Sequence, residues 1–151
     1  MQTLSFQESL GRYLNELGLS KGPIELSQLT GGQSNPTFKI SDGNFDYVLR
    51  KKPSGVLLPS AHAVDREYRV MKALAATDVP VPQMLAYCDD ESIIGTAFFI
   101  MEYLDGRVFA DQSLPGLEAS ERQQIYEQMN HTISAIHRLD YVSLGLETFG
   151  K

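Results

Sequence analysis

A glycine pair followed by short polar residues is the part of this sequence that most directly suggests chemistry. Gly31 and Gly32 stand between two segments with strand character, so the backbone there can bend tightly and leave its amides uncovered. Consecutive free N–H groups attract phosphate, and Ser34 and Asn35 add polar side chains at the same bend. The next strand ends in three cations, Arg50, Lys51 and Lys52. The pattern predicts a nucleotide-binding hairpin, while a glycine pair alone is also typical of an ordinary tight turn.

A carboxylate in the following segment is the second candidate. A helix is expected to open at residues 59–60, and Glu67 falls on its apolar face. The other members of that face are Val64, Tyr68, Met71, Leu74 and Ala75. An unpaired charge on a core-facing stripe typically costs roughly 3–5 kcal/mol, so Glu67 requires a partner. Arg50 is the best candidate, because a guanidinium can take a carboxylate side-on. Such a pair is compatible with a purely structural role as well as with ligand binding.

These residues must be positioned by an antiparallel sheet. Alternating and extended segments predict strands at residues 24–29, 37–40, 45–50, 84–88 and 96–103. The turn at 41–44 joins the second and third, and the polar turn at 89–92 joins the last two. On the third strand Phe45, Tyr47 and Leu49 share one face, and Asp46, Val48 and Arg50 share the other. The economical packing is an α+β arrangement with a helix on one face.

Two further helices flank these strands. Ser5 and Glu8 have capping-box spacing, apolar residues recur at helical intervals, and Gly18 is the expected stop. Ser120 and Gln123 predict a second capping box, with a helix running to about residue 138. The apolar stripe of that last helix consists of Ile125, Met129, Ile133 and Ile136. It is expected to be core, left partly uncovered if its partner segment is absent.

Composition narrows the class of protein. The chain has 151 residues, 42% of them hydrophobic and 21% charged, which is ordinary for a globular domain. Its net charge of -6 argues against a nucleic-acid partner. A single cysteine, Cys88, cannot form an internal disulfide and is expected in the core. With no leader segment and no membrane-spanning run, a cytoplasmic location is expected. His62 and His131 are expected at the surface of the protein.

Together these segments carry a family resemblance. The chain resembles the N-terminal part of the aminoglycoside phosphotransferase family of kinase-like enzymes, closest to the branch found alone in bacteria or ahead of acyl-CoA dehydrogenase modules. The segments that carry it are residues 31–38, 47–53, 61–70, 80–82 and 98–107. The resemblance implies a protein-kinase-like N-lobe with a five-stranded antiparallel sheet in residues 1–104. Residues 105–151 would then hold the hinge exit and the first helix of an incomplete C-lobe.

The resemblance also implies a site for ATP and Mg²⁺. Gly31, Gly32 and Ser34 would cover the phosphates, and Arg50 would stand where kinases place the strand lysine, paired with Glu67. The hinge would be residues 101–104, and its backbone would meet the adenine. The hinge residues expected to bind the base are Met101, Glu102 and Tyr103.

Two departures from the family pattern affect this expectation. An arginine replaces the lysine, so either Arg50 or Lys52 is left to contact phosphate. The chain also ends before the family's His-Gly-Asp segment and its later metal-binding aspartate, so metal ligands are expected beyond Lys151 and this chain alone is expected to be inactive. His137 to Asp140 has a leucine inserted into a His-Arg-Asp pattern and is interpreted as a helix terminus.

Two functions remain open from the sequence. The first is a nucleotide-binding part of an ATP-dependent phosphotransferase that acts on a small-molecule hydroxyl, with hydroxyacyl substrates suggested by the dehydrogenase-linked branch. The second is a non-catalytic kinase-like module that associates with itself through the face formed by Ile125 to Ile136.

Overall fold

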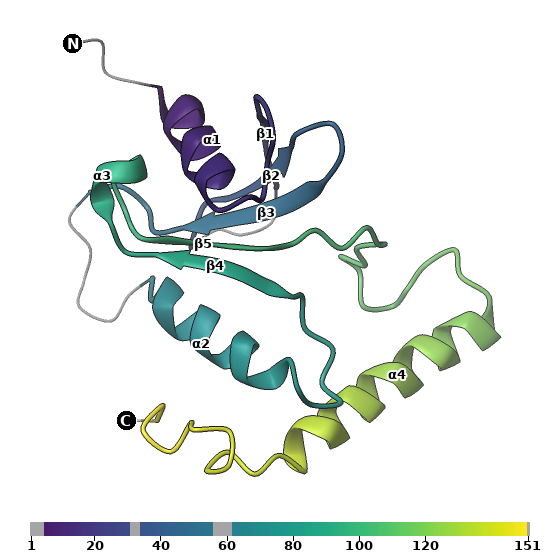
Figure 1. The fold of residues 1–151 in the computed structure, drawn as a ribbon. Helices are drawn as coiled ribbons and strands as arrows, with labels where there is room; N and C mark the ends of the chain where they lie inside the picture. Colours follow the sequence, from purple (N-terminus) through teal and green to yellow (C-terminus); the bar gives the residue numbers. More distant parts are fainter. Residues whose placement is uncertain (1–4, 31–33, 56–61, 151) are drawn as a thin grey trace. The chain divides into compact units, whose positions relative to one another are not determined.

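The computed structural model describes residues 5–30, 34–55 and 62–150 of the chain. Its elements in chain order are α1 (Phe6–Glu16), β1 (Glu25–Gln28), β2 (Thr37–Ser41), β3 (Asp46–Lys51), α2 (Val64–Leu74), β4 (Met84–Cys88), α3 (Glu91–Ile94), β5 (Phe98–Glu102) and α4 (Ala119–His137) (Figure 1). They divide between two compact units, Met1–Lys72 with Pro82–Tyr103, and Ala73–Val81 with Leu104–Lys151. None of the helices in the described ranges is long and apolar enough to cross a membrane.

The first unit contains one five-stranded sheet in the order β1-β2-β3-β5-β4, with every neighbouring pair antiparallel. The predicted α+β class and the three-strand meander are confirmed. The turn between β2 and β3 forms because Asp42 Oδ1 accepts hydrogen bonds from the amides of Asn44 (2.9 Å) and Phe45 (2.8 Å), while Gly43 takes a positive φ of 84°. These two bonds hold the pKa of Asp42 below its ordinary value.

Helix α1 covers one face of this sheet (Figure 1). Its predicted capping box is confirmed, since Ser5 Oγ accepts from the Glu8 amide and Glu8 Oε2 accepts from the Ser5 amide. One turn apart, Leu10 and Leu14 are fully buried in the main apolar cluster. The strand side chains of that cluster are Ile40, Leu49, Cys88, Phe98 and Ile100. Cys88 is therefore a core residue, as expected.

Helix α2 covers the opposite face (Figure 1), where Val64 packs with Ala97 and Phe99. The sheet thus has helices on both faces rather than on one. The reason is visible on β3, where the neighbours Val48 and Leu49 point to opposite faces and both are buried. In the described residues α2 begins at Val64, and its predicted opening at residues 59–60 lies outside them.

A one-turn helix, α3, stands between β4 and β5 where the sequence predicted only a polar turn. Asp90 is its N-cap and accepts from the Ser92 amide at 2.8 Å, and Gly95 ends it in the left-handed conformation with φ 81°. The capping residues were visible in the sequence, but a single turn leaves no room for an apolar period.

The second unit contains α4, whose predicted N-terminus was wrong. The N-cap is Glu118, Ser120 lies inside the first turn, and Gln123 donates to Glu127 instead of closing a capping box. The predicted end near residue 138 is confirmed. Three residues of the predicted stripe are about half exposed: Met129 at 52%, Ile133 at 48% and Ile136 at 47%. The stripe is left partly uncovered.

Candidate functional site

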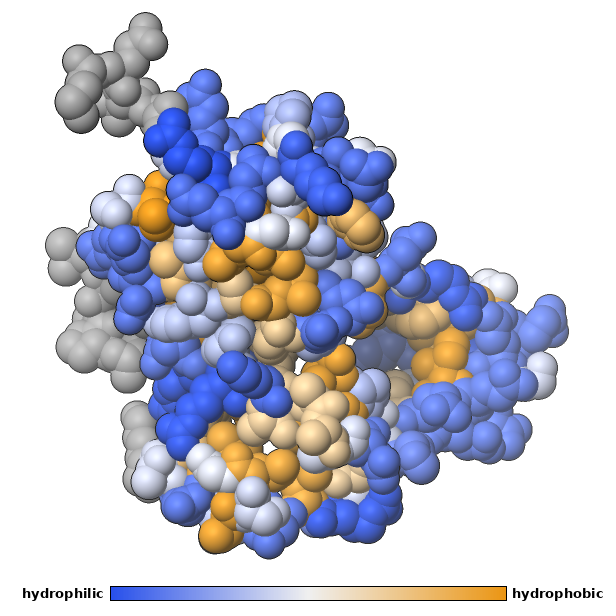
Figure 2. All heavy atoms as spheres, viewed as in Figure 1, coloured by the Kyte–Doolittle hydropathy of each residue, from blue (hydrophilic) through white to orange (hydrophobic). Residues whose placement is uncertain are grey.

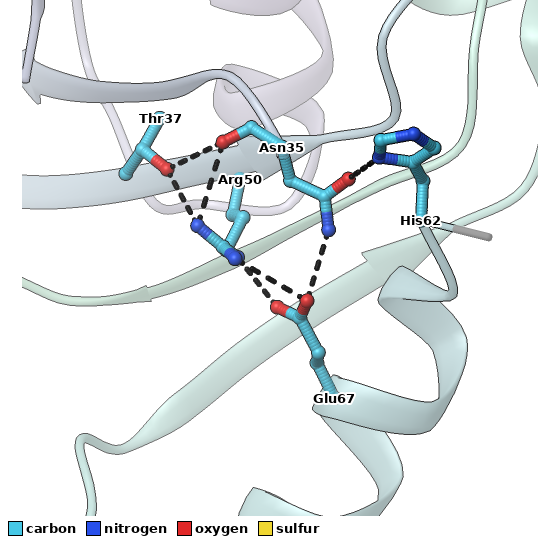
Figure 3. A network of polar contacts seen from close by, with 5 residues as sticks. All are labelled: Asn35, Thr37, Arg50, His62 and Glu67. Carbon is cyan, nitrogen blue, oxygen red and sulfur yellow. Dashed lines mark hydrogen bonds and ion pairs between the residues drawn. The ribbon is translucent and has the colours of Figure 1, made fainter. Parts of the chain in front are cut away.

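The predicted ion pair between Arg50 and Glu67 is present. Arg50 lies near the end of β3 on the face that α2 covers, and Glu67 lies one turn into α2. Arg50 Nε is 2.5 Å from Glu67 Oε2 and Nη2 is 3.3 Å from Oε1, so the guanidinium takes the carboxylate side-on (Figure 3). The two side chains are 24% and 34% exposed, so the penalty for stranding Glu67 is smaller than expected for a fully buried charge.

The loop and strand before Arg50 hold the other end of its guanidinium. Thr37 is the cross-strand partner of Arg50 in the β2–β3 register, and Arg50 Nη1 donates to Thr37 Oγ1 at 2.9 Å. Nη1 also donates to the carbonyl of Asn35 at 3.4 Å, and that carbonyl accepts from Thr37 Oγ1 at 3.1 Å. An arginine has five N–H groups, and four of those of Arg50 are engaged by described residues.

Asn35 links this pair to a histidine. Its side chain is 2% exposed, and Nδ2 donates to Glu67 Oε1 at 2.9 Å while Oδ1 lies 3.0 Å from His62 Nδ1 (Figure 3). The expectation that His62 is a surface residue was wrong: it is half-buried and hydrogen-bonded, because a contact across 27 positions draws its ring inward. His131 is exposed, as expected.

The two lysines after Arg50 have different surroundings. Lys51 is 9% exposed, and its Nζ donates to the Lys52 carbonyl at 3.1 Å. Burial lowers the pKa of its ammonium. Lys52 lies one residue beyond β3, half-buried, with its amide bonded to the Ala97 carbonyl at 3.0 Å. Within the described ranges its ammonium has no bonded partner, so Lys52 is the more available cation for an anion.

The predicted hinge residues lie on and just after β5. Met101 is half-buried and is the cross-strand partner of Val48. Glu102 uses its amide for the Gln83 carbonyl at 2.9 Å and its carboxylate for the Gln83 amide at 3.1 Å, so that N–H group is not available to a base. The ring of Tyr103 lies under the ammonium group of Lys39.

Lys39 lies on β2, and the sequence analysis did not single it out. Lys39 Nζ is 4.3 Å from the centroid of the Tyr103 ring and 2.7 Å from Asp46 Oδ2. The hydrogen bond from Lys39 holds the pKa of Asp46 below its ordinary value. Lys39, Val48 and Met101 follow one another across three strands, so the hinge residues adjoin the face that carries Arg50.

The structure therefore brings Arg50 and Glu67 together and places Ser34, which is exposed, next in the chain to Asn35. Gly31 and Gly32 lie outside the described residues. The sequence analysis missed Thr37 and His62, and it noted Asn35 only as a polar residue at the bend. The β2–β3 register, which the turn residues fix, could have identified Thr37 as the neighbour of Arg50. No sequence signal pointed to His62.

Known proteins resemble this chain in sequence and in fold. A model of the family described as "Phosphotransferase enzyme family" matches residues 25–151. Acyl-CoA dehydrogenase family member 10 of Mus musculus is 53% identical over 147 residues, which are 96% of this chain and 14% of that protein. Acyl-CoA dehydrogenase family member 11 of Homo sapiens is 44% identical over 147 residues, 97% of this chain and 19% of that protein. The chain thus spans less than a fifth of these relatives.

A solved structure from Ralstonia eutropha, named as a candidate aminoglycoside phosphotransferase, has the same fold with a TM-score of 0.80. The two sequences are 48% identical, and the match covers 95% of this chain and 41% of that one. The predicted resemblance and the kinase-like N-terminal fold are confirmed, and the chain belongs to the phosphotransferase enzyme family.

Proposed function

We propose that this chain is the nucleotide-binding N-terminal part of an ATP-dependent phosphotransferase that acts on a hydroxyl group of a small molecule. The observation that carries the proposal is the side-on pair of Arg50 and Glu67, held from both sides by Thr37 and by Asn35, the residue after Ser34. Membership of the phosphotransferase family supports it. In this proposal the chain binds and orients the triphosphate, because phosphoryl transfer depends chiefly on positioning and charge stabilisation.

Each cation would have its own part in holding the phosphates. The charge of Arg50 is already offset by Glu67. Its described partners bond four of its five N–H groups, so that one N–H on Nη2 is still available. Arg50 would therefore supply one directed hydrogen bond, while Lys52, whose ammonium has no bonded partner among the described residues, would supply the attraction of a positive charge. The partly exposed side chain of Met101, next to the buried Val48, would receive the base.

The Mg²⁺ that accompanies ATP would bridge and neutralise the phosphates when bound. Among the described residues no group of three His, Cys, Asp or Glu side chains is placed to hold a metal ion. We propose no metal ligand among the described residues, and no turnover by this part of the protein alone. A hydroxyacyl acceptor belongs to the same proposal, and the names of the relatives support it. A cytoplasmic location also belongs to it, and the free, buried thiol of Cys88 supports that location.

Calorimetric titration of the chain with Mg-ATP tests the proposal. We expect weak but saturable binding that falls at least about tenfold in Arg50→Ala, equivalent to about 1.4 kcal/mol. Gly32→Val should weaken it as well. Arg107→Ala is the matched control, since it removes an exposed arginine with its own carboxylate partner, Glu121, in the second unit. Binding that is absent in the wild type, or equal in all four proteins, would contradict the nucleotide site.

The exposed face of α4 supports a second candidate, a binding module that associates with itself. Met129, Ile133 and Ile136 are each about half exposed. Figure 2 shows apolar surface among hydrophilic side chains in the right-hand part of the view, where Figure 1 draws the segment before α4 and the start of that helix. Light scattering during gel filtration at increasing concentration tests this candidate. A dimer that Ile133→Asp converts to a monomer supports it, and a monomer at every concentration rejects it.

A further inference from the structure

Asn35 is bonded to each of the other four residues of the network in Figure 3. Its Nδ2 donates to Glu67, its Oδ1 faces His62, and its carbonyl accepts from both Thr37 and Arg50. At 2% exposure it is also the most buried of the five. A buried amide whose bonds all go to one ion pair and its neighbours fixes the geometry of that pair, because any rotation would break several bonds at once.

The orientation of this amide follows from its partners. Nδ2 must face Glu67, because a turned amide would set its oxygen against a carboxylate oxygen. Oδ1 therefore accepts from His62, whose Nδ1 carries the proton. His62 reaches this position with a left-handed backbone, φ 57°, a conformation in which histidine is enriched relative to most side chains. His62 thus fixes the amide, and the amide fixes the carboxylate.

The effect on Arg50 is that its guanidinium is held from two sides. Glu67, held in turn by Asn35, accepts from Nε and Nη2. The Asn35 carbonyl and Thr37 accept from Nη1. We propose that Asn35 is a positioning residue for phosphate recognition, which keeps the remaining Nη2 N–H of Arg50 in one direction, and that His62 supports Asn35 in this role. The inference rests on the proposed nucleotide site.

A positioning role and a merely structural role predict different binding patterns. If Asn35 only stabilises the fold, its loss lowers the melting temperature and leaves the preference for ATP over adenosine unchanged. If it positions Arg50, its loss weakens the part of the affinity that depends on phosphate and spares the part that depends on the base. The ratio of the two dissociation constants is therefore the readout, with adenosine measured by competition against a fluorescent ATP analogue.

We expect Asn35→Ala and Asn35→Asp each to weaken ATP binding about tenfold while adenosine binding changes less than about twofold. The aspartate variant keeps the size of the side chain but places a second carboxylate 2.9 Å from where Glu67 Oε1 lies. Ser20→Ala is the control for a buried polar residue elsewhere: Ser20 is 4% exposed, and its Oγ donates to the Gly22 carbonyl at 3.1 Å. It should change neither ligand.

A pair of variants at His62 keeps the test decisive if the Asn35 variants fail to fold. Asparagine tolerates the left-handed backbone, and its amide places an N–H donor near the position of Nδ1. We expect His62→Asn to retain the ATP preference of the wild type and His62→Ala to lose about threefold of it. Equal loss in both variants, or no loss in either, would overturn the part assigned to His62.

The outcomes separate this inference from the function on which it rests. No ATP binding by the wild-type chain overturns both. ATP binding that falls in Arg50→Ala but keeps its ratio to adenosine in the folded Asn35 and His62 variants overturns the positioning role and leaves the nucleotide site standing.

Discussion

The two faces of the sheet bury adjacent cations in opposite ways. On the α2 face, Arg50 meets a carboxylate, a hydroxyl and a carbonyl that engage four of its five N–H groups. Lys51, the next residue, points by strand alternation to the α1 face, beside the position of Leu49. There it is 9% exposed, and a neighbouring carbonyl is its one bonded partner among the described residues.

Arg50 belongs to a hydrogen-bonded polar site, whereas Lys51 is an isolated buried charge. The α1 face closes with apolar side chains, and its lysine responds to burial with a lowered pKa. The α2 face has its own apolar cluster around Val64 and Phe99, and beside that cluster it carries the network of Asn35 and Arg50. Directional bonds that hold a guanidinium in place are useful for recognising a ligand, whereas a desolvated ammonium mainly lowers stability. The candidate site therefore belongs to the α2 face.

The largest expected effect is on the α1 face. Leu49 is fully buried in its cluster, so Leu49→Ala should lower the free energy of unfolding by about 2–5 kcal/mol through lost burial and a residual cavity. Urea denaturation followed by circular dichroism measures this. The affinity of the folded fraction for Mg-ATP should stay at the wild-type value. A loss of affinity as large as that in Arg50→Ala would show that the two faces are not functionally separate.

Breaking the ion pair should cost less. Glu67→Gln replaces one acceptor oxygen with an amide that faces the donors of Arg50, and the pair is a quarter to a third exposed. We expect a loss of about 1–2 kcal/mol, below the cost for a fully buried pair. Arg50→Lys is the matched variant: it keeps the charge but cannot bind side-on, and should lose a similar amount. If Glu67→Gln were as stable as the wild type, the ion pair would not contribute to the stability of the fold.

The ion pair was predictable from the sequence because both of its determinants are local. Helical periodicity placed Glu67 on an apolar face, and strand alternation turned Arg50 toward a helix. The meander was predictable for the same reason, since its turn is closed by Asp42 and Gly43 within four residues. Sequence patterns of this kind specify which face a residue occupies and where a turn falls.

The other parts of the fold and of the candidate site could not be predicted, because they depend on interactions that no local sequence pattern indicates. His62 joins the site through a contact with Asn35 across 27 positions. Helix α4 starts at Ala119 with Glu118 as its N-cap, although Glu118 makes no side-chain cap bond and the sequence motif stood at Ser120. The glycine pair, the most suggestive feature of the sequence, lies outside the described residues, so the phosphate-binding part of the prediction rests on its neighbours.

The smallest expected effect concerns Lys51 and depends on pH. Its pKa in the folded protein lies below 10.5, its ordinary value, so between the two values the unfolded chain binds more protons than the folded chain. The free energy of unfolding should therefore rise with pH in that window, and the penalty should be fully present at neutral pH. Lys51→Met removes it, so we expect a gain of less than about 1 kcal/mol at pH 7 and a flatter profile up to pH 10.

Lys21→Met is the matched control for this prediction, because Lys21 is exposed and its replacement should leave the rise with pH in place. Urea denaturation between pH 7 and pH 10 compares the three proteins. If the wild-type profile is flat, or if Lys51→Met keeps the same slope, then the Lys51 ammonium is solvated in the folded state. Lys51 would then not be the desolvated cation of β3. A selective loss of slope in Lys51→Met instead assigns the cost of burial to the Lys51 ammonium on the α1 face.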